Sequence, residues 1–213
     1  MKNNAMIFGD SYSTFKDCVP EGYAVYYSPE DEKMSGVTNV ADTWWHQVIS
    51  EKGLELILNN SWSGSTICYT GYNGCDCSSS SSFIYRLRRL CEDGFFSDNE
   101  IDTVFVFGGT NDSWSNAPLG ALKTEGVGED DLYSVLPAIP YFFMSLKKAL
   151  PRADIYCLIN TDIKPEITHA LEYSCELYGI KRIRFDKIEK KWGHPTPQGM
   201  KDIKDAVVAA MAD

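Results

Sequence analysis

The chain has 213 residues, which fits one domain with its own hydrophobic core, so a single domain over residues 1–213 is expected. Apolar residues make up 44% of the chain and charged residues 23%, as in an ordinary globular protein. The formal net charge of −10 argues against nucleic acid or an anionic membrane as a partner, because both bind basic surfaces. No apolar run approaches the roughly 20 residues of a membrane span.

The first residues and the cysteines bear on location and on metal binding. No apolar secretion segment follows Met1, which favours a cytoplasmic location, with an already removed signal segment as the alternative. The seven cysteines are an odd number, which is not typical of a disulfide framework. Cys75 and Cys77, with Cys68 and Cys91 nearby, lack the paired spacing of zinc ligands, so no metal site is expected there. The function favoured below requires no cofactor, and none is expected.

Apolar runs and helical periodicity alternate along the chain. Strands are predicted at Ala5–Phe8, Leu54–Asn59, Thr103–Phe107, Asp154–Ile159 and Arg182–Phe185. Helices are predicted at Val40–Lys52, Phe83–Cys91, Leu132–Leu150, Pro165–Tyr178 and from Thr196-Pro197 through Met211. Pro137 and Pro140 are expected to break or kink the start of the third helix. This alternation predicts an α/β fold, a three-layer α/β/α sandwich around a doubly wound parallel sheet of five strands.

Four short motifs lie where the strands of such a sheet end or the last helix begins. Ser11, in Gly9-Asp10-Ser11, follows the first strand, and Gly64 and Asn111 follow the second and third strands. His194 precedes the last helix. The carboxyl ends of these strands meet at one crevice, where a serine hydroxyl, a histidine base and N–H donors would suffice for acyl transfer. Gly-Asp-Ser alone would be ordinary turn chemistry.

These motifs, in this order and spread over nearly the whole chain, resemble those of the SGNH hydrolase superfamily, the GDSL-type esterases and lipases. The resemblance implies a flavodoxin-like α/β/α sandwich, which agrees with the strand count. It also implies that Ser11 is the nucleophile and His194 the general base. The oxyanion hole would consist of the Ser11 N–H, the Gly64 N–H and the Asn111 side chain.

One position departs from the family pattern. The family usually has an aspartate three residues before the histidine, and this chain has Lys191, which cannot accept a hydrogen bond from the imidazole. Glu189 and Asp186 are the nearest acids, and Glu189 is the preferred candidate for the triad acid. The alternative is a Ser–His dyad whose imidazole is held by a backbone carbonyl or water.

Aromatic residues in the loops around Ser11 bear on the substrate. Among them, Tyr12, Trp62 and Trp114 are the candidate substrate-binding residues, because rings with polar edges stack on sugars or contact acyl chains. A short-chain ester, such as an acetyl group on a carbohydrate, is the expected substrate. The alternatives are a thioesterase or lysophospholipase on the same site, and a non-catalytic carbohydrate-binding protein derived from a hydrolase, which Lys191 would favour.

Overall fold

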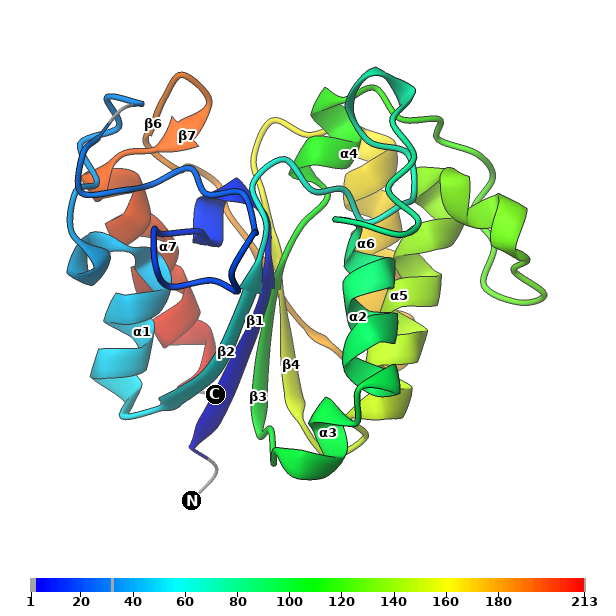
Figure 1. Ribbon diagram of the computed structural model, residues 1–213, viewed down its shortest axis with the longest axis horizontal. Coiled ribbons are helices and arrows are strands. Elements are labelled where there is room, and N and C mark those ends of the chain that lie inside the picture. The colour runs from blue at the N-terminus through cyan, green and yellow to red at the C-terminus, as the bar shows by residue number, and fades with distance from the viewer. Residues whose placement is uncertain (1–2, 32, 213) are drawn as a thin grey trace.

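The computed structural model describes residues 3–31 and 33–212, and their strands form one parallel sheet in the order β2-β1-β3-β4-β5. Its strands are β1 (Asn4–Gly9), β2 (Glu55–Ser61), β3 (Thr103–Phe107), β4 (Asp154–Ile159) and β5 (Lys181–Arg184). Helices cover both faces of the sheet (Figure 1). The predicted three-layer α/β/α sandwich is therefore confirmed.

The helices divide into two layers. One layer contains α1 (Trp44–Lys52) and α7 (Pro197–Ala210), which pack on each other, and the other contains α2 (Phe83–Glu92), α5 (Val135–Ala149) and α6 (Pro165–Tyr178) (Figure 1). Along β1, Ala5 and Ile7 enter the core under the first layer, whereas Met6 and Phe8 enter the core under the second. Because both faces of the strand are buried, its sequence is a continuous apolar run.

Two predicted helices differ from the structure at their starts. The segment Val40–Lys52 is a 3₁₀ turn, η2 (Val40–Asp42), followed by α1, because the Thr43 hydroxyl accepts a hydrogen bond from an N–H of the first turn of α1. Likewise, η4 (Glu129–Tyr133) precedes α5. Pro140 lies inside α5 and does not end it, and Pro137 falls in the first turn, where its missing N–H leaves no bond unmade.

Several short elements were not predicted. They are η1 (Ser11–Ser13), η3 (Tyr72–Gly74), α3 (Phe95–Asp98), α4 (Thr110–Trp114) and a hairpin of β6 (Lys190–Lys191) and β7 (His194–Pro195). Of these, η1, α4 and the hairpin carry the residues singled out in the sequence motifs. In Figure 1, α4 and the hairpin lie at the upper end of the molecule, beyond the carboxyl ends of the strands, whereas α3 lies at the lower end.

Two further observations on the described residues concern membrane-spanning helices and metal-binding clusters. In residues 3–31 and 33–212, no helix has both the length and the apolar character that crossing a membrane requires. Within the same ranges, no three His, Cys, Asp or Glu side chains gather in a way that could hold a metal ion.

Candidate active site

Ser11 lies on a tight turn at the end of β1. The Asp10 carboxylate accepts a hydrogen bond from the Tyr12 N–H at 3.0 Å and thereby caps η1. A Cβ atom on Gly9 would lie 2.4 Å from the Ser61 hydroxyl oxygen and 2.6 Å from the Ser13 Cβ, so only glycine fits there. The Gly-Asp-Ser motif is therefore explained by close packing at the strand end and by the cap.

His194 reaches Ser11 from the β6–β7 hairpin. Its Nε2 atom lies 3.0 Å from the Ser11 hydroxyl oxygen, and its Nδ1 atom lies 3.3 Å from the carbonyl oxygen of Trp192. A carbonyl accepts only, so Nδ1 donates to it and Nε2 accepts from the serine hydroxyl. Burial lowers the pKa of His194 to about 4, with a smaller effect of the same sign from the positive charge of Lys190. The imidazole is therefore a neutral base at neutral pH.

Aromatic side chains fix the hairpin and the imidazole. The buried Tyr12 and Tyr27 donate their hydroxyls to the carbonyls of Gly193 and Pro195, which flank the histidine. The Tyr26 ring stacks on the imidazole, with 3.6 Å between ring centres and 5° between planes. The Tyr26 ring thus contacts one face of the imidazole, and the two hydroxyls fix the backbone on either side of His194.

The geometry around His194 corrects the preference for Glu189 as the acid. The Glu189 carboxylate accepts a hydrogen bond from the Thr196 hydroxyl at 2.6 Å, and Thr196 in turn caps α7. Among the described residues, the ring nitrogens of His194 have only the Ser11 hydroxyl and the Trp192 carbonyl as hydrogen-bond partners. The Ser11 hydroxyl, the imidazole and the Trp192 carbonyl thus form a hydrogen-bonded row, in which a backbone carbonyl occupies the position expected for a carboxylate.

Three N–H donors belong to the residues of the expected oxyanion hole, Ser11, Gly64 and Asn111. The Asn111 amide is fixed at both ends, because its nitrogen donates to the Ser65 carbonyl at 3.0 Å and its oxygen accepts from the Tyr72 hydroxyl at 2.9 Å. Its second N–H and the backbone N–H groups of Ser11 and Gly64 have no acceptor in the part of the chain that the structure describes. They are thus available to an oxyanion.

Two buried aspartates have bracing roles. Both carboxylate oxygens of Asp112 accept hydrogen bonds from the backbone N–H groups of Ile67 and Cys68, at 2.9 to 3.1 Å, as expected for a residue that braces the loop. The cap by Asp10 confirms the same expectation for that residue. Burial raises the pKa of Asp10 to about 7, and one of its oxygens has no hydrogen-bond partner among the described residues.

The three expected substrate-binding residues differ in exposure. Tyr12 is fully buried, so it supports the hairpin and does not line an open surface, contrary to expectation. Trp62 is half-buried and packs against Tyr23, with 4.3 Å between ring centres and 35° between the ring planes. Trp114 is 38% exposed and lies edge-on to His194.

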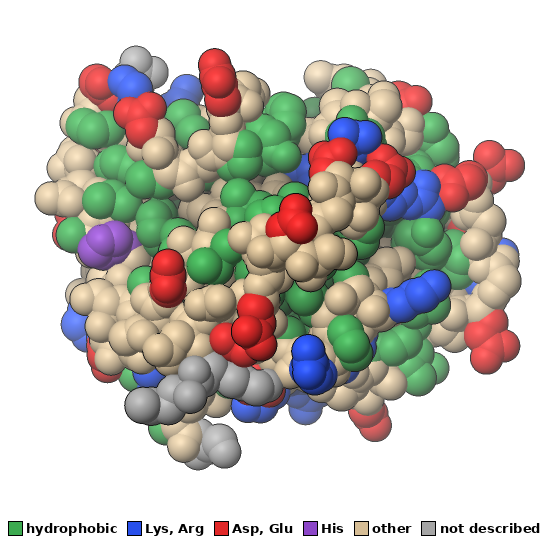
Figure 2. Space-filling view, turned by 60° about the horizontal axis from the view of Figure 1, so that its bottom comes forward, with side chains coloured by type: hydrophobic (Ala, Val, Ile, Leu, Met, Phe, Trp, Pro, Cys, Tyr) green, Lys and Arg blue, Asp and Glu red, His purple; other side chains and the backbone are tan. Residues whose placement is uncertain are grey.

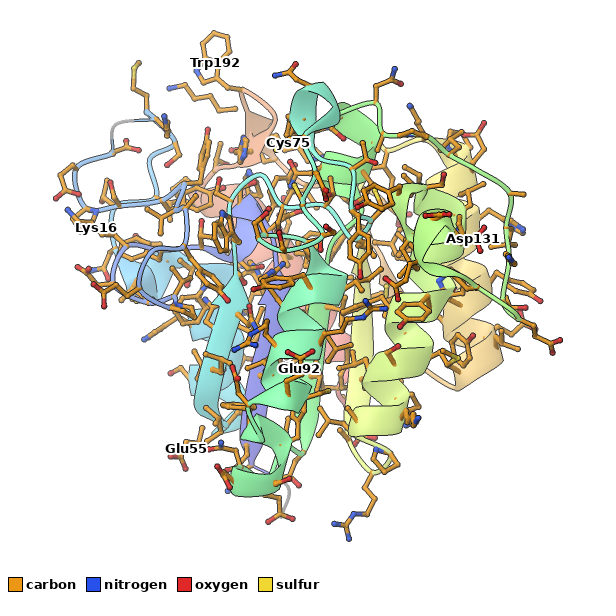
Figure 3. The ribbon with its side chains drawn as sticks, turned by 45° about the vertical axis from the view of Figure 1, so that its right-hand side comes forward. Lys16, Glu55, Cys75, Glu92, Asp131 and Trp192 are labelled. Carbon is orange, nitrogen blue, oxygen red and sulfur yellow. The ribbon has the colours of Figure 1, made fainter. Side chains whose placement is uncertain are left out.

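Sequence reasoning missed a prominent residue, Trp192, whose carbonyl orients His194 while 77% of its side chain is exposed. Figure 3 shows it at the outer tip of the hairpin, at the same end of the molecule as Cys75. Its position next to His194 was the available signal.

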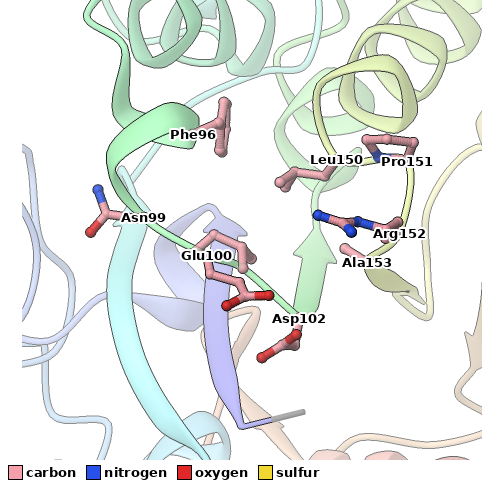
Figure 4. Close-up of a pocket in the computed structure, with 9 residues that line it drawn as sticks. Phe96, Asn99, Glu100, Asp102, Leu150, Pro151, Arg152 and Ala153 are labelled. Atoms are coloured by element: carbon pink, nitrogen blue, oxygen red, sulfur yellow. The ribbon is translucent and has the colours of Figure 1, made fainter.

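A cavity lies at the end of the molecule opposite to Ser11. It has a volume of about 530 Å³ and is lined by Phe96, Asp102, Leu150 and Arg152 among others (Figure 4). Acidic and basic side chains are interspersed on the described part of the face in Figure 2. Because this cavity lies at the amino ends of β3 and β4, it is separate from Ser11.

Comparisons with known proteins agree with this site. A protein from Bacteroides uniformis described as a GDSL-like lipase is 42% identical, with a TM-score of 0.91 over 99% of this chain and 96% of its own. Its counterpart from Bacteroides ovatus is 38% identical, with a TM-score of 0.91 over 99% and 98% of the two chains. An acetyl xylan esterase from Butyrivibrio proteoclasticus, 17% identical, shares the fold with a TM-score of 0.60 over 98% of this chain and 63% of its own.

No curated protein matches the chain by sequence. The family model for GDSL-like lipases and acylhydrolases, however, matches residues 3–211. The chain therefore belongs to the GDSL-like lipase/acylhydrolase family and is a hydrolase of ester bonds.

Proposed function

We propose that this hydrolase cleaves short-chain acyl esters through an acyl-enzyme on Ser11, with His194 as the general base. The observation that carries the proposal is the 3.0 Å approach of the His194 Nε2 atom to the Ser11 hydroxyl, with Nδ1 bound to a carbonyl. This pairing is the geometry of an activated nucleophile. The partial burial of the imidazole keeps it unprotonated, as the base must be before attack.

In the first half-reaction, His194 takes the hydroxyl proton while the Ser11 oxygen attacks the carbonyl carbon of the ester. The carbonyl oxygen becomes an oxyanion, to which the N–H groups of Ser11 and Gly64 and the free amide N–H of Asn111 would donate. When the tetrahedral intermediate collapses, the bond to the alcohol breaks, and the imidazolium gives its proton to the leaving oxygen. The acyl group remains on Ser11.

In the second half-reaction, a water molecule replaces the alcohol. His194 takes a proton from the water, whose oxygen attacks the acyl carbon, and the same oxyanion forms. Collapse releases the carboxylic acid and returns the proton to the Ser11 oxygen. In both halves the imidazolium exists briefly, and the Trp192 carbonyl stabilises it through the Nδ1–H bond, although less than a carboxylate would.

The proposed substrate is an acetyl ester on a carbohydrate. Three exposed aromatic residues support it. The Trp114 ring lies edge-on to His194, the Tyr72 hydroxyl binds Asn111, and Trp192 binds the imidazole through its backbone carbonyl. Their side chains are 38%, 41% and 77% exposed, respectively. Exposed aromatic rings beside a reactive serine offer stacking surfaces for sugar rings. The acetyl xylan esterase that shares the fold acts on esters of this class, which adds support.

The mechanism is tested by p-nitrophenyl acetate hydrolysis with wild type, Ser11→Ala and His194→Ala. We expect kcat/KM to fall by roughly 10³-fold or more in both variants, as for other serine hydrolases that lose the nucleophile or base. Wild-type activity no higher than that of the folded alanine variants would contradict an acyl-enzyme on Ser11. It would favour a carbohydrate-binding protein instead.

The substrate is tested separately, with acetylated xylo- and cello-oligosaccharides and with p-nitrophenyl esters from acetyl to octanoyl. We expect release of acetate from the sugars, and kcat/KM values that fall as the acyl chain lengthens. Equal rates on acetyl and octanoyl esters, with no acetate released from the sugars, would contradict the carbohydrate proposal. That pattern would favour a thioesterase or lysophospholipase.

A further inference from the structure

We propose that Arg86 is a positioning residue for this ester hydrolysis, because its buried guanidinium ties together the segments that carry Ser11, Gly64 and Asn111. Its fixed positive charge also lies next to these segments, in contact with Gly9 and Ser65. Arg86 lies on α2, is 1% exposed and belongs to none of the four sequence motifs. The proposal rests on the proposed function, since it assigns a role in the reaction of Ser11.

Every N–H group of the guanidinium has an acceptor. Nη1 donates to the backbone carbonyl of Asn60 and, at 2.9 Å, to its side-chain oxygen. Nη2 donates to the Gly9 carbonyl at 3.3 Å and to the Ser65 hydroxyl at 3.1 Å, and Nε donates to the Ser81 carbonyl at 2.9 Å. A guanidinium has five such donors in one plane, so this environment fits arginine and no other side chain.

Two acceptors of Arg86, Gly9 and Ser65, lie within two residues of Ser11 and Gly64 in the sequence. Gly9 is two residues before Ser11, and Ser65 directly follows Gly64. The Ser65 carbonyl also accepts the amide N–H of Asn111, at 3.0 Å. A single side chain thus connects the nucleophile turn directly with the segment of Gly64, through the Gly9 carbonyl and the Ser65 hydroxyl. It connects with Asn111 indirectly, because Ser65 also binds the Asn111 amide.

The charge of Arg86 is not used in an ion pair with any described residue. All of its hydrogen-bond acceptors are neutral, and its guanidinium lies over the Phe83 ring, 4.4 Å from the ring centre. It is also the only buried lysine or arginine in residues 3–31 and 33–212. Burying a charge without a direct ion pair costs free energy, which suggests that the charge serves another purpose.

The buried acids near Ser11 suggest that purpose. Asp10 and Asp112 are both fully buried, and any negative charge on them opposes a second negative charge on an oxyanion nearby. Arg86 is close enough to Asp10 for its positive charge to favour the ionised carboxylate. The same fixed charge would favour the oxyanion of the transition state, in a low-dielectric region where such an interaction is strong.

The test compares Arg86→Gln and Arg86→Lys with Arg89→Gln as a matched control. Arg89 lies on the same helix but is exposed and binds Glu92 and Asp93. We expect kcat for p-nitrophenyl acetate to fall about a hundredfold in Arg86→Gln and about tenfold in Arg86→Lys, which keeps the charge but not the planar donors. KM should stay within about threefold of wild type, and Arg89→Gln should behave as wild type.

A second readout separates catalysis from general loosening of the fold. Benzeneboronic acid forms a tetrahedral anion on a serine hydroxyl, so its Ki should rise in parallel with the loss of kcat/KM across the variants. Circular dichroism and thermal unfolding establish which variants are folded. If Arg86→Gln does not fold, Arg86→Lys alone provides the comparison.

The proposal is overturned if folded Arg86 variants have the kcat of Arg89→Gln, or if only KM changes, or if the boronate Ki stays constant while kcat falls. Ser11→Ala is measured beside them. If Ser11→Ala keeps wild-type activity, the proposed function itself fails. If Ser11→Ala is inactive while the Arg86 variants are unaffected, only the role of Arg86 fails.

Discussion

The imidazole of His194 is oriented by the backbone of Trp192, whose carbonyl oxygen lies 3.3 Å from the Nδ1 atom. This contact arises from the hairpin turn, in which Trp192 and Gly193 have positive φ angles of 52° and 80°. Such angles are unusual for a tryptophan and turn the chain back within two residues. The acceptor that orients the imidazole is therefore part of the same hairpin as His194.

One prediction concerns Glu189. In Glu189→Gln, the amide oxygen can still accept the Thr196 hydroxyl, so we expect kcat/KM within about threefold of wild type. Replacing the acid of a true triad by its amide lowers kcat by roughly 10⁴-fold, so the two models differ widely. The measurement is p-nitrophenyl acetate hydrolysis, with Asp186→Asn as a second acid variant. A loss above a hundredfold in folded Glu189→Gln would restore that residue as the acid.

The pH profile is a second prediction. Because burial lowers the pKa of His194 to about 4, the imidazole stays neutral down to that pH and loses its function as a base only below it. We therefore expect the acid limb of kcat/KM to have its midpoint near pH 4, far below the 6.5 of an ordinary histidine. Stopped assays with a non-chromogenic acetyl ester cover this range. A midpoint at 6.5 or higher would contradict the assigned environment.

Much of the fold could be predicted from the sequence because the central strands are buried on both faces. Thr103–Phe107, Asp154–Ile159 and Pro165–Tyr178 have the predicted bounds, since an apolar run or an N1 proline with a closing glycine marks both ends. The β6–β7 hairpin could not be predicted in this way. Strands of two residues are too short to show a period.

The residues of the candidate site also differ in whether the sequence alone could indicate them. Ser11, Gly64, Asn111 and His194 stand in recognisable motifs, but the acceptor for the imidazole is a backbone carbonyl, which no residue type signals. The burial of Arg86 could not be predicted either, because an arginine within an amphipathic helix is expected at the surface. Its burial depends on carbonyls from the ends of β1 and β2, which only the folded chain brings together.

Tyr72 provides a third prediction. Its hydroxyl donates to the Asn111 oxygen and so fixes which end of the amide faces the Ser65 carbonyl. We expect Tyr72→Phe to lower kcat about tenfold, and Asn111→Ala, which removes the donor itself, to lower it by about 10² to 10³-fold. Tyr133→Phe is the matched control, because Tyr133 is similarly exposed and its hydroxyl donates to Asp76 instead. Equal kcat values in the two tyrosine variants would contradict this role of Tyr72.

The last prediction concerns stability and Asp10. Burial raises its pKa from 3.8 to about 7, so between these pH values the folded chain holds a proton that the unfolded chain has released. The free energy of unfolding of wild type should therefore decline, relative to Asp10→Asn, as pH rises through this window. The amide oxygen of the variant can still accept the Tyr12 N–H, so the cap is kept.

The size of this change follows from the shift in the pKa of Asp10, because each pKa unit corresponds to about 1.4 kcal/mol. Urea unfolding at pH 4, 5.5 and 8 should thus show the advantage of Asp10→Asn over wild type growing by about 4 kcal/mol across the series. A difference that does not change with pH would mean that Asp10 is ionised in the folded protein throughout. In that case the negative charge beside Ser11 would be permanent, and its compensation by Arg86 would be needed at every pH at which the enzyme works.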